Sequence, residues 1–202
     1  MTAINLINSI IFPIKLIIPQ PVIRKIPGLT TNEDIRIDEV IRLMRGYSLD
    51  IGCGPNHLIA EYKKRGGTGV GVDVYDWGAQ DLLVKDTADL PYDDGTFDTV
   101  TMVACLNHIP NRKEVLIETR RILKPDGCLV FTNLSPLISQ IWHKYAFWDE
   151  DQHDRGMKEG EVYGFTGSQL RELLGETGFE IKEAHSFSWG LNKIYRCSIK
   201  EG

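Results

Sequence analysis

The feature that most constrains the fold is a glycine turn placed directly after a short apolar segment. We predict a buried strand over Tyr47–Ile51 that ends in Gly52-Cys53-Gly54, because glycines let a backbone pass close to a ligand that a Cβ would exclude. A helix through about residue 65 follows, and a second strand over Thr68–Asp73 ends in an acid 19 residues after Gly54. This order predicts a βαβ unit with a ligand at the carboxyl ends of its strands.

The chain beyond residue 31 continues to alternate helices with strands. We predict helices over 32–46, 112–123 and 167–175, and strands over 83–85, 99–104 and 128–132. The tail differs, since two further strands over 180–187 and 193–200 flank Trp189-Gly190 and form an antiparallel hairpin at the sheet edge. The expected fold class is therefore α/β, with a doubly wound, mostly parallel sheet, a C-terminal antiparallel hairpin and an apolar N-terminal helical arm.

Composition limits the classes of function that are open to the chain. Its 202 residues suit one domain with a full core, and 42% hydrophobic with 25% charged residues is ordinary for a folded protein. The 23 basic and 28 acidic residues give a net charge of −5, which argues against a nucleic-acid partner. The four cysteines form no CxxC pair, so we expect reduced thiols in a cytoplasmic protein, without a disulfide scaffold or a metal site.

Residues 1–31 differ from the rest, because they contain three basic residues and no acidic one. An apolar helical stripe is predicted from isoleucines spaced three and four positions apart, at Ile4, Ile7, Ile11, Ile14 and Ile18. Pro13 should kink this helix, and the prolines at 19, 21 and 27 should prevent regular structure after it. The uncharged run over residues 1–14 is shorter than the roughly 18 to 20 residues that span a bilayer. We therefore divide the chain into an arm over 1–31 and a domain over 32–202.

Two interpretations of this arm stay open. In the first, its helix packs on the domain or covers the active site. In the second, residues 1–28 make a peripheral contact with the inner face of a membrane, and Lys15, Arg24 and Lys25 face the lipid head groups.

The glycine turn lacks the last glycine of a dinucleotide-binding fingerprint. A GxGxxG pattern that begins at Gly52 requires glycine at position 57, where this chain has His57. We predict that His57 obstructs the close contact between helix and strand that this glycine permits. NAD and FAD are therefore disfavoured, and a ligand without a pyrophosphate fits better. Asp73 is placed to accept hydrogen bonds from the ribose hydroxyls of such a ligand.

Four sequence segments together carry a family resemblance. They are LDIGCGPN at 49–56, GVDV at 71–74, DTADLPY with DGTFD at 86–92 and 94–98, and LKPDGCL at 123–129. In this order they resemble the class I S-adenosylmethionine-dependent methyltransferases, in the small-molecule branch (methyltransferase type 11) that includes the quinone-biosynthesis enzymes. The resemblance covers about residues 47–133 and implies S-adenosyl-L-methionine as the cofactor. Asn56 departs from it, because a third glycine is common there.

The resemblance also implies which residues bind the cofactor. The backbone at Gly52, Cys53 and Gly54 would lie under the methionine part, with Asp50 supporting the turn or the amino group. Asp73 would take the ribose hydroxyls. The other implied cofactor-binding positions are Val74 against adenine, Asp86 with Thr87 and Ala88 at the adenine amino group, and Ala104 and Cys105 on the methionine side. Cys53 and Cys105 are also typical of small packing residues beside such a pocket.

Methyl transfer from a sulfonium depends mainly on positioning, which can supply roughly 7 to 11 kcal/mol. A base is needed only where the acceptor must lose a proton. His108 lies in the segment 105–110, just after the strand predicted to end at the methyl side, and it is our candidate for a catalytic base or for substrate orientation. The alternative is a histidine that packs on the cofactor or caps the next helix.

The segment 148–163 contains six acidic and two basic residues and lacks apolar periodicity, so we predict a loop. In the family that this chain resembles, such a loop covers the acceptor site, which makes His143, His153 and Tyr163 candidate substrate contacts. The alternative is a solvated acidic loop. The acids disfavour a strongly anionic acceptor.

We therefore predict an enzyme that methylates a small acceptor, which can be hydrophobic or lipid-linked: a quinol, a glycan intermediate or a natural product. The alternative function is a non-catalytic S-adenosylmethionine-binding partner or sensor protein.

Overall fold

A computed structural model describes residues 18, 20–137, 139–140 and 159–200 of the chain. Its centre is a seven-stranded sheet in the order β3-β2-β1-β4-β5-β7-β6. The strands are β1 Tyr47–Ile51, β2 Thr68–Asp73, β3 Leu82–Leu83, β4 Phe97–Met102, β5 Leu123–Leu134, β6 Phe179–Phe187 and β7 Asn192–Ile199. The first five pair in parallel, whereas β7 runs antiparallel to both β5 and β6. The predicted fold class is confirmed.

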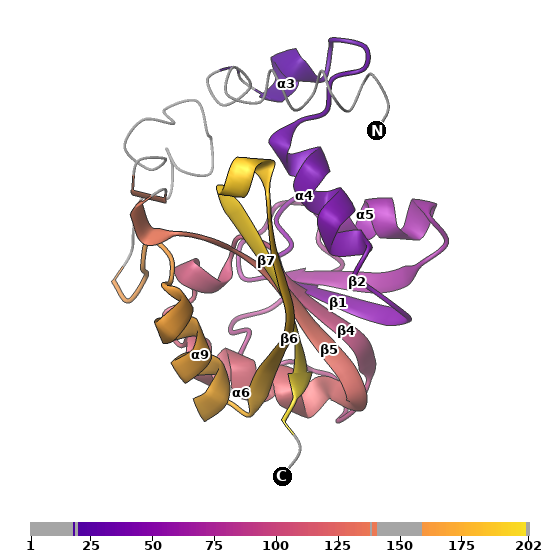
Figure 1. The fold of residues 1–202 in the computed structure, drawn as a ribbon. Coiled ribbons are helices and arrows are strands. Elements are labelled where there is room, and N and C mark those ends of the chain that lie inside the picture. The colour runs from indigo at the N-terminus through magenta and orange to yellow at the C-terminus, as the bar shows by residue number, and fades with distance from the viewer. Residues whose placement is uncertain (1–17, 19, 138, 141–158, 201–202) are drawn as a thin grey trace.

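The helices cover both faces of this sheet (Figure 1). They are α3 Gln20–Ile23, α4 Asn32–Ile41, α5 His57–Lys64, α6 Arg112–Ile122 and α9 Gly167–Glu176, with short 3-10 turns η1 Leu106–His108 and η2 Ser188–Gly190. The strand β5 shows the two layers directly. Leu129 and Phe131 belong to the core cluster shared with α6 and α9, while Cys128 and Val130 belong to the cluster shared with α4 and α5. This alternation is the period of two of a strand that is buried on both faces.

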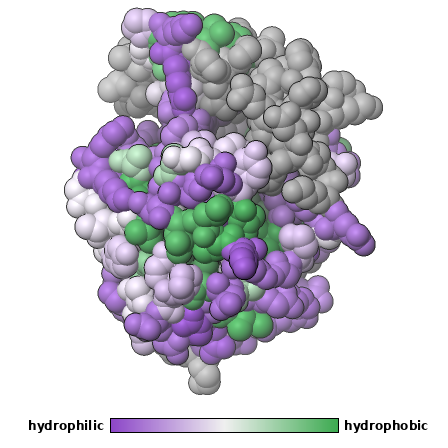
Figure 2. Space-filling view, turned by 180° about the vertical axis from the view of Figure 1, so that it is seen from behind, coloured by the Kyte–Doolittle hydropathy of each residue, from purple (hydrophilic) through white to green (hydrophobic). Residues whose placement is uncertain are grey.

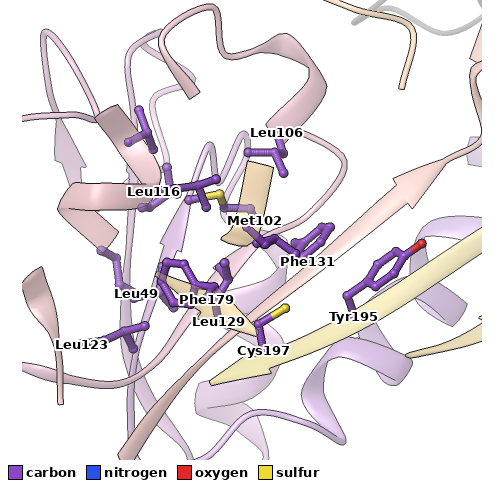
Figure 3. Close-up of a cluster of buried hydrophobic side chains, with 14 of the residues drawn as sticks. Leu49, Met102, Leu106, Leu116, Leu123, Leu129, Phe131, Phe179, Tyr195 and Cys197 are labelled. Atoms are coloured by element: carbon purple, nitrogen blue, oxygen red, sulfur yellow. The ribbon is translucent and has the colours of Figure 1, made fainter. Parts of the chain in front are cut away.

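The larger cluster fills the space between the sheet, α6 and α9 (Figure 3). Phe131 on β5 lies opposite Tyr195 on β7, and their rings stack with centroids 4.9 Å apart. Cross-strand aromatic pairs of this kind stabilise a sheet by roughly 0.2 to 1 kcal/mol relative to alanine pairs. The pair therefore helps to hold the antiparallel strand β7 beside the parallel part of the sheet.

Local sequence signals explain where two of the helices begin. Thr31 accepts a hydrogen bond from the backbone of Asp34, whose side chain accepts one in return from the backbone of Thr31. Thr166 and Gln169 make the same reciprocal contacts at the start of α9. These capping boxes satisfy backbone N–H groups that would otherwise lack partners in the first turn.

Several predicted boundaries are wrong. The helix from residue 32 ends at Ile41 rather than at 46, because the chain turns there to enter β1 and the backbone of Arg45 bonds the Thr99 hydroxyl. Strand β5 begins at Leu123, five residues earlier than predicted. Strands β3 and β4 each begin and end one or two residues earlier than the strands predicted over 83–85 and 99–104. The prolines of the arm do not abolish regular structure, since Pro21 lies in α3, in the first turn where a missing N–H costs little.

Residues 1–17 of the arm, with most of its isoleucine stripe, lie outside the described residues. Further along, Ile23 is buried, and the Arg24 guanidinium lies 2.7 Å from the Glu33 carboxylate on α4. This contact ties the end of the arm to the domain, while the boundary at residue 31 and both interpretations of the arm stay predictions. None of the helices in the described part of the chain has the length and apolar character needed to cross a bilayer.

On the side seen in Figure 2, an apolar area is bordered by hydrophilic residues.

Candidate active site

The predicted glycine turn and the acid at the end of β2 lie side by side. Gly52 and Gly54 have positive φ angles of 70° and 53°. The backbone N–H of Gly54 donates a hydrogen bond of 2.9 Å to Oδ2 of Asp73, and Oδ1 of Asp73 accepts one from the backbone of Tyr75. A Cβ at Gly54 would meet no atom within 4 Å, so open space lies beside this turn. The sequence predicted this pairing of turn and acid.

Asp50 lies under the turn, inside β1, and is only 2% exposed. The pKa of its carboxyl group is raised to about 7, mainly because the group is buried. The hydrogen bond from Thr101 lowers this pKa, and the nearby Asp73 carboxylate raises it. The Thr101 hydroxyl lies 2.6 Å from Oδ1 of Asp50. At neutral pH this carboxyl group is therefore divided between its two protonation states, and a cationic group placed against it would favour the ionised form.

The residues at the end of β4 complete this side of the site. The backbone N–H of Ala104, at a positive φ of 55°, donates to the Thr132 hydroxyl, and the thiol of Cys105 lies 3.0 Å from the Ile51 carbonyl. A Cβ at Gly52 would lie 2.9 Å from the Cβ of Cys105, so the segment just after β4 packs directly on the turn. Burial, followed by the carboxylate of Asp50, raises the pKa of the Cys53 thiol far above its usual range. The Cys53 thiol therefore sits beside the turn as a neutral packing group.

The segment predicted to reach adenine is anchored to a helix. The Asp86 carboxylate accepts hydrogen bonds from the backbone of Ala88 and, at 3.0 and 3.1 Å, from the side-chain amide of Asn111 just before α6. These bonds hold the pKa of Asp86 below its ordinary value. Thr87 is buried and Val74, beyond the end of β2, is exposed. Asp86 thus fixes the position of its own loop, and its contact with adenine stays a prediction.

Asn56 links the glycine turn to the loop after β2. It has a positive φ of 62°, and its amide nitrogen donates to the Ala79 carbonyl and to the Asp81 carboxylate, both at 3.0 Å. Asp81 also accepts from the backbone of Gly71, where an added Cβ would lie 2.2 Å from Oδ1 of Asn56. Asparagine is among the few residues that adopt this backbone conformation. The sequence signal for this positive φ was therefore the asparagine itself, at a position where the family commonly has glycine.

The predicted role of His57 in excluding dinucleotides is wrong in its geometry. The imidazole does not stand between helix and strand. It is exposed at the start of α5, with Nδ1 2.6 Å from the Glu33 carboxylate on α4. Leu58, Ile59 and Tyr62 make the buried face of α5 instead. The first turn of the helix directs residue 57 outward, which the spacing of the motif alone does not reveal.

His108 has a carboxylate partner that sequence reasoning missed. Its Nδ1 lies 3.1 Å from Oε2 of Glu161, and these two side chains are 14% and 3% exposed. Glu161 was predicted to lie in a loop that either covers the acceptor site or is solvated, and because its side chain is buried, solvation is wrong for this residue. No local pattern predicts the contact, because the two residues are 53 positions apart.

The remaining substrate candidates fall into two groups. His143 and His153 lie outside the described residues. Tyr163 is 38% exposed, and it lies two residues before Phe165, whose backbone N–H and carbonyl both bond the side-chain amide of Asn133 at the end of β5. Tyr163 is therefore held at the carboxyl end of the sheet, next to the segment that contains Glu161.

This combination defines a class of protein. A doubly wound sheet with a glycine turn after β1, an acid at the end of β2 and an antiparallel strand β7 inserted beside β5 is the architecture of a class I methyltransferase. A family model described as "Methyltransferase domain" matches residues 36–184. The chain belongs to this methyltransferase-domain family, which confirms the resemblance inferred from its motifs.

Curated relatives agree with this assignment over part of their length. The chain is 29% identical over 128 residues to a demethylmenaquinone methyltransferase of Staphylococcus epidermidis, a match that covers 56% of this chain and 53% of the relative. It is 36% identical over 69 residues to the mitochondrial 2-methoxy-6-polyprenyl-1,4-benzoquinol methylase of Homo sapiens, covering 32% and 21%. The chain thus spans about half the length, or less, of the curated relatives it matches.

Solved structures confirm the fold. A S-adenosylmethionine-dependent methyltransferase from Methanosarcina mazei superposes with a TM-score of 0.58 at 21% identity, covering 77% of this chain and 93% of that one. A 4+2 cyclase named SpnF superposes with a TM-score of 0.63 at 17% identity, covering 86% and 83%. The same fold therefore supports different reactions, and the reaction must be argued from the site.

The family identifies S-adenosyl-L-methionine as the cofactor, and the residues present fit it. The open space beside Gly54 leaves room for a ligand against the backbone of the turn. The carboxylates of Asp50 and Asp73 are acceptors suited to an amino group and to ribose hydroxyls. The roles of the individual cofactor-binding residues stay predictions.

Proposed function

We propose that this chain is an S-adenosylmethionine-dependent methyltransferase whose acceptor is an uncharged aromatic ring of the hydroquinone class. The observation that carries the proposal is the hydrogen-bonded pair of Gly54 and Asp73 beside an open glycine turn. The relatives named for demethylmenaquinone and for a polyprenyl benzoquinol support the choice of acceptor.

Charge around the site supports an uncharged acceptor. Asp50, Asp73, Asp86 and Glu161 all contribute carboxyl groups at this end of the sheet. An anionic acceptor would be repelled by the ionised members of this set, whereas a quinol with its hydroxyls protonated would not be. The charge of the site therefore favours a quinol over a phosphorylated glycan intermediate.

The cofactor, when bound, supplies a methyl group that its sulfonium has already activated. The chain's own residues then have three tasks. The turn at Gly52–Gly54 and the carboxylate of Asp73 hold the cofactor, and Asp50 pairs with its amino group. Tyr163 orients the acceptor. His108 accepts the proton that a hydroxyl or ring carbon of the acceptor releases.

A direct test has two stages. Calorimetry with S-adenosylhomocysteine measures cofactor binding by wild type, by Asp73→Ala and by Asp93→Ala, a control at an exposed acid. Transfer of label from S-adenosylmethionine carrying a labelled methyl group is then measured with reduced demethylmenaquinone, a prenylated benzoquinol, a glycan and no acceptor.

We expect binding by wild type and by the control, weak binding by Asp73→Ala, and transfer to at least one quinol. Absence of binding by folded wild type contradicts the cofactor site. Transfer to the glycan but to no quinol contradicts the acceptor class, and binding without transfer to any acceptor favours the alternative of a non-catalytic binding protein.

A further inference from the structure

The contact between His108 and Glu161 determines which nitrogen of the imidazole carries a proton. An ionised carboxylate can only accept hydrogen bonds, so with Oε2 of Glu161 3.1 Å away, Nδ1 of His108 must be the donor. The Arg112 guanidinium lies near this carboxylate: burial lowers the pKa of Arg112, and the negative charge of Glu161 offsets part of that lowering. The neutral ring then has its acceptor lone pair on Nε2.

The segment that contains Glu161 is fastened on both sides of it. The backbone N–H of Val162 donates a 2.9 Å hydrogen bond to the carbonyl of Asn107, the residue before His108. The Arg112 guanidinium donates to the carbonyl of Gly160. Gly160 packs so closely on Pro110 that an added Cβ would lie 2.8 Å from the Cβ of the proline. These contacts fix the backbone of the glutamate relative to η1, so its side chain holds a defined position.

We propose that Glu161 is a positioning residue that holds His108 in the tautomer protonated on Nδ1, with Nε2 as the proton acceptor. The inference rests on the proposed function, because it assigns the proton-accepting atom of that reaction. The acceptor's hydroxyl or ring carbon gives up a proton to Nε2, and the electron pair of the broken bond stays on the acceptor. Glu161 remains ionised and stabilises the imidazolium that forms, as a buried carboxylate does for a catalytic histidine in other enzymes.

The first experiment reads the tautomer and needs no acceptor. Protein labelled with 15N at its histidines is examined by long-range 15N–1H correlation. The pH is raised until the histidine signals no longer change, and the spectrum of His108→Gln identifies the signals of His108. We expect the Nδ1–H pattern in wild type and in Glu159→Gln, a control at an exposed glutamate two positions away. In Glu161→Ala the pattern should shift toward the Nε2–H tautomer. An Nε2–H pattern in wild type, or no change in Glu161→Ala, overturns the proposal.

The second experiment measures turnover with a quinol that wild type methylates. Glu161→Ala should lower kcat by roughly 100-fold, the scale of one acid–base contribution, while KM for the cofactor changes less than about twofold. Glu161→Asp should recover part of the loss, because a carboxylate is retained one methylene shorter. Thermal unfolding shows whether each variant is folded, and the nearly isosteric Glu161→Gln replaces any variant that is not.

The two experiments separate this proposal from the proposed function. If wild type methylates no quinol, the proposed acceptor fails while the tautomer measurement still decides the role of Glu161. If wild type is active and Glu161→Ala keeps its kcat, Glu161 is only a structural contact and the proposal is overturned.

Discussion

The backbone N–H of Gly54 and the carboxylate of Asp73 are joined by a 2.9 Å hydrogen bond, although 19 residues separate them. This bond connects the turn after β1 to the end of β2, so the two parts of the predicted cofactor site are positioned relative to each other before any ligand binds. The remaining oxygen of Asp73 bonds the backbone of Tyr75 and holds the next loop. One side chain therefore organises three backbone segments of the site.

Asp73→Asn should weaken binding of S-adenosylhomocysteine by roughly 10- to 100-fold, since a hydrogen bond to a charged group contributes about 1.5 to 3 kcal/mol. The amide keeps the size of the side chain but loses its charge and one acceptor. Calorimetry on Asp73→Asn and on the exposed control Asp93→Asn tests this. Equal affinities for the two variants would remove Asp73 from the binding site.

Asp50 should make stability depend on pH in an unusual direction. Burial raises the pKa of this group to about 7 from an ordinary value of 3.8. Between these values the folded chain retains a proton that the unfolded chain has released, so the contribution of Asp50 to stability falls as pH rises from about 4 to about 7 and is constant above that. Urea unfolding of wild type and Asp50→Asn at both ends of this window should show a smaller loss in the variant. Equal losses would contradict the shifted pKa.

Asp50 should also couple cofactor binding to proton release. A cationic amino group favours the ionised carboxylate, so affinity for S-adenosylmethionine should rise as pH increases from 6 toward 8 and level off above the pKa of about 7. Calorimetry in two buffers with different ionisation enthalpies measures the number of protons released. Asp50→Asn should release fewer protons, and an unchanged number would separate Asp50 from the ligand.

Asn56→Gly should be better tolerated than Asn56→Ala, even though both remove the amide. Glycine adopts the positive φ of 62° without strain, whereas alanine adds roughly 1 kcal/mol or more. Both variants lose the bonds to Ala79 and Asp81. The backbone N–H groups of Gly71 and Asp81 should therefore exchange hydrogen faster, while the exchange rates in the paired strands β5 and β7 should not change. Equal stability of the two variants would contradict the strain expected at this φ, and unchanged exchange at Gly71 would show that the link is not needed.

Gly164→Ala should release the segment that contains Glu161. Gly164 has a φ of 145°, and a Cβ there would lie 2.3 Å from the Leu134 carbonyl, a contact that the backbone must move to relieve. We expect a loss of about 2 to 4 kcal/mol in the free energy of unfolding, in the range of other strained substitutions. Gly167→Ala, at the start of α9 with 3.6 Å to its nearest atom, is the control and should change stability by less than about 1 kcal/mol. Similar values for both would refute the close contact.

Much of the fold was predictable because its signals are local. The bounds of β1 and β2 agree with the prediction, since each is a short apolar run ended by glycine or an acid at a turn. Helix α9 differs only by one residue at its end. The start of β5 was missed because Lys124-Pro125-Asp126-Gly127 has the composition of a turn, and only pairing of Leu123 with Phe97 makes it part of a strand.

The site was predictable to the extent that its residues belong to contiguous motifs. Asp50, Gly54 and Asp73 lie together as expected, because parallel strands bring their carboxyl ends to one edge of the sheet. Glu161 was not found, since its contact with His108 depends on where a distant segment docks on η1. The direction of His57 was also wrong, because the first turn of α5 sets it and the motif spacing does not.

The position of β7 has a consequence for synthesis and engineering. This strand is the last in the described chain, yet it lies between β5 and β6 and pairs with both. A nascent chain on the ribosome therefore cannot close its sheet until the residues up to Ile199 have left the exit tunnel. Truncating the chain before Asn192 would remove an interior strand and leave β6 without a neighbour, so deletions from this end should be far more damaging than their length suggests.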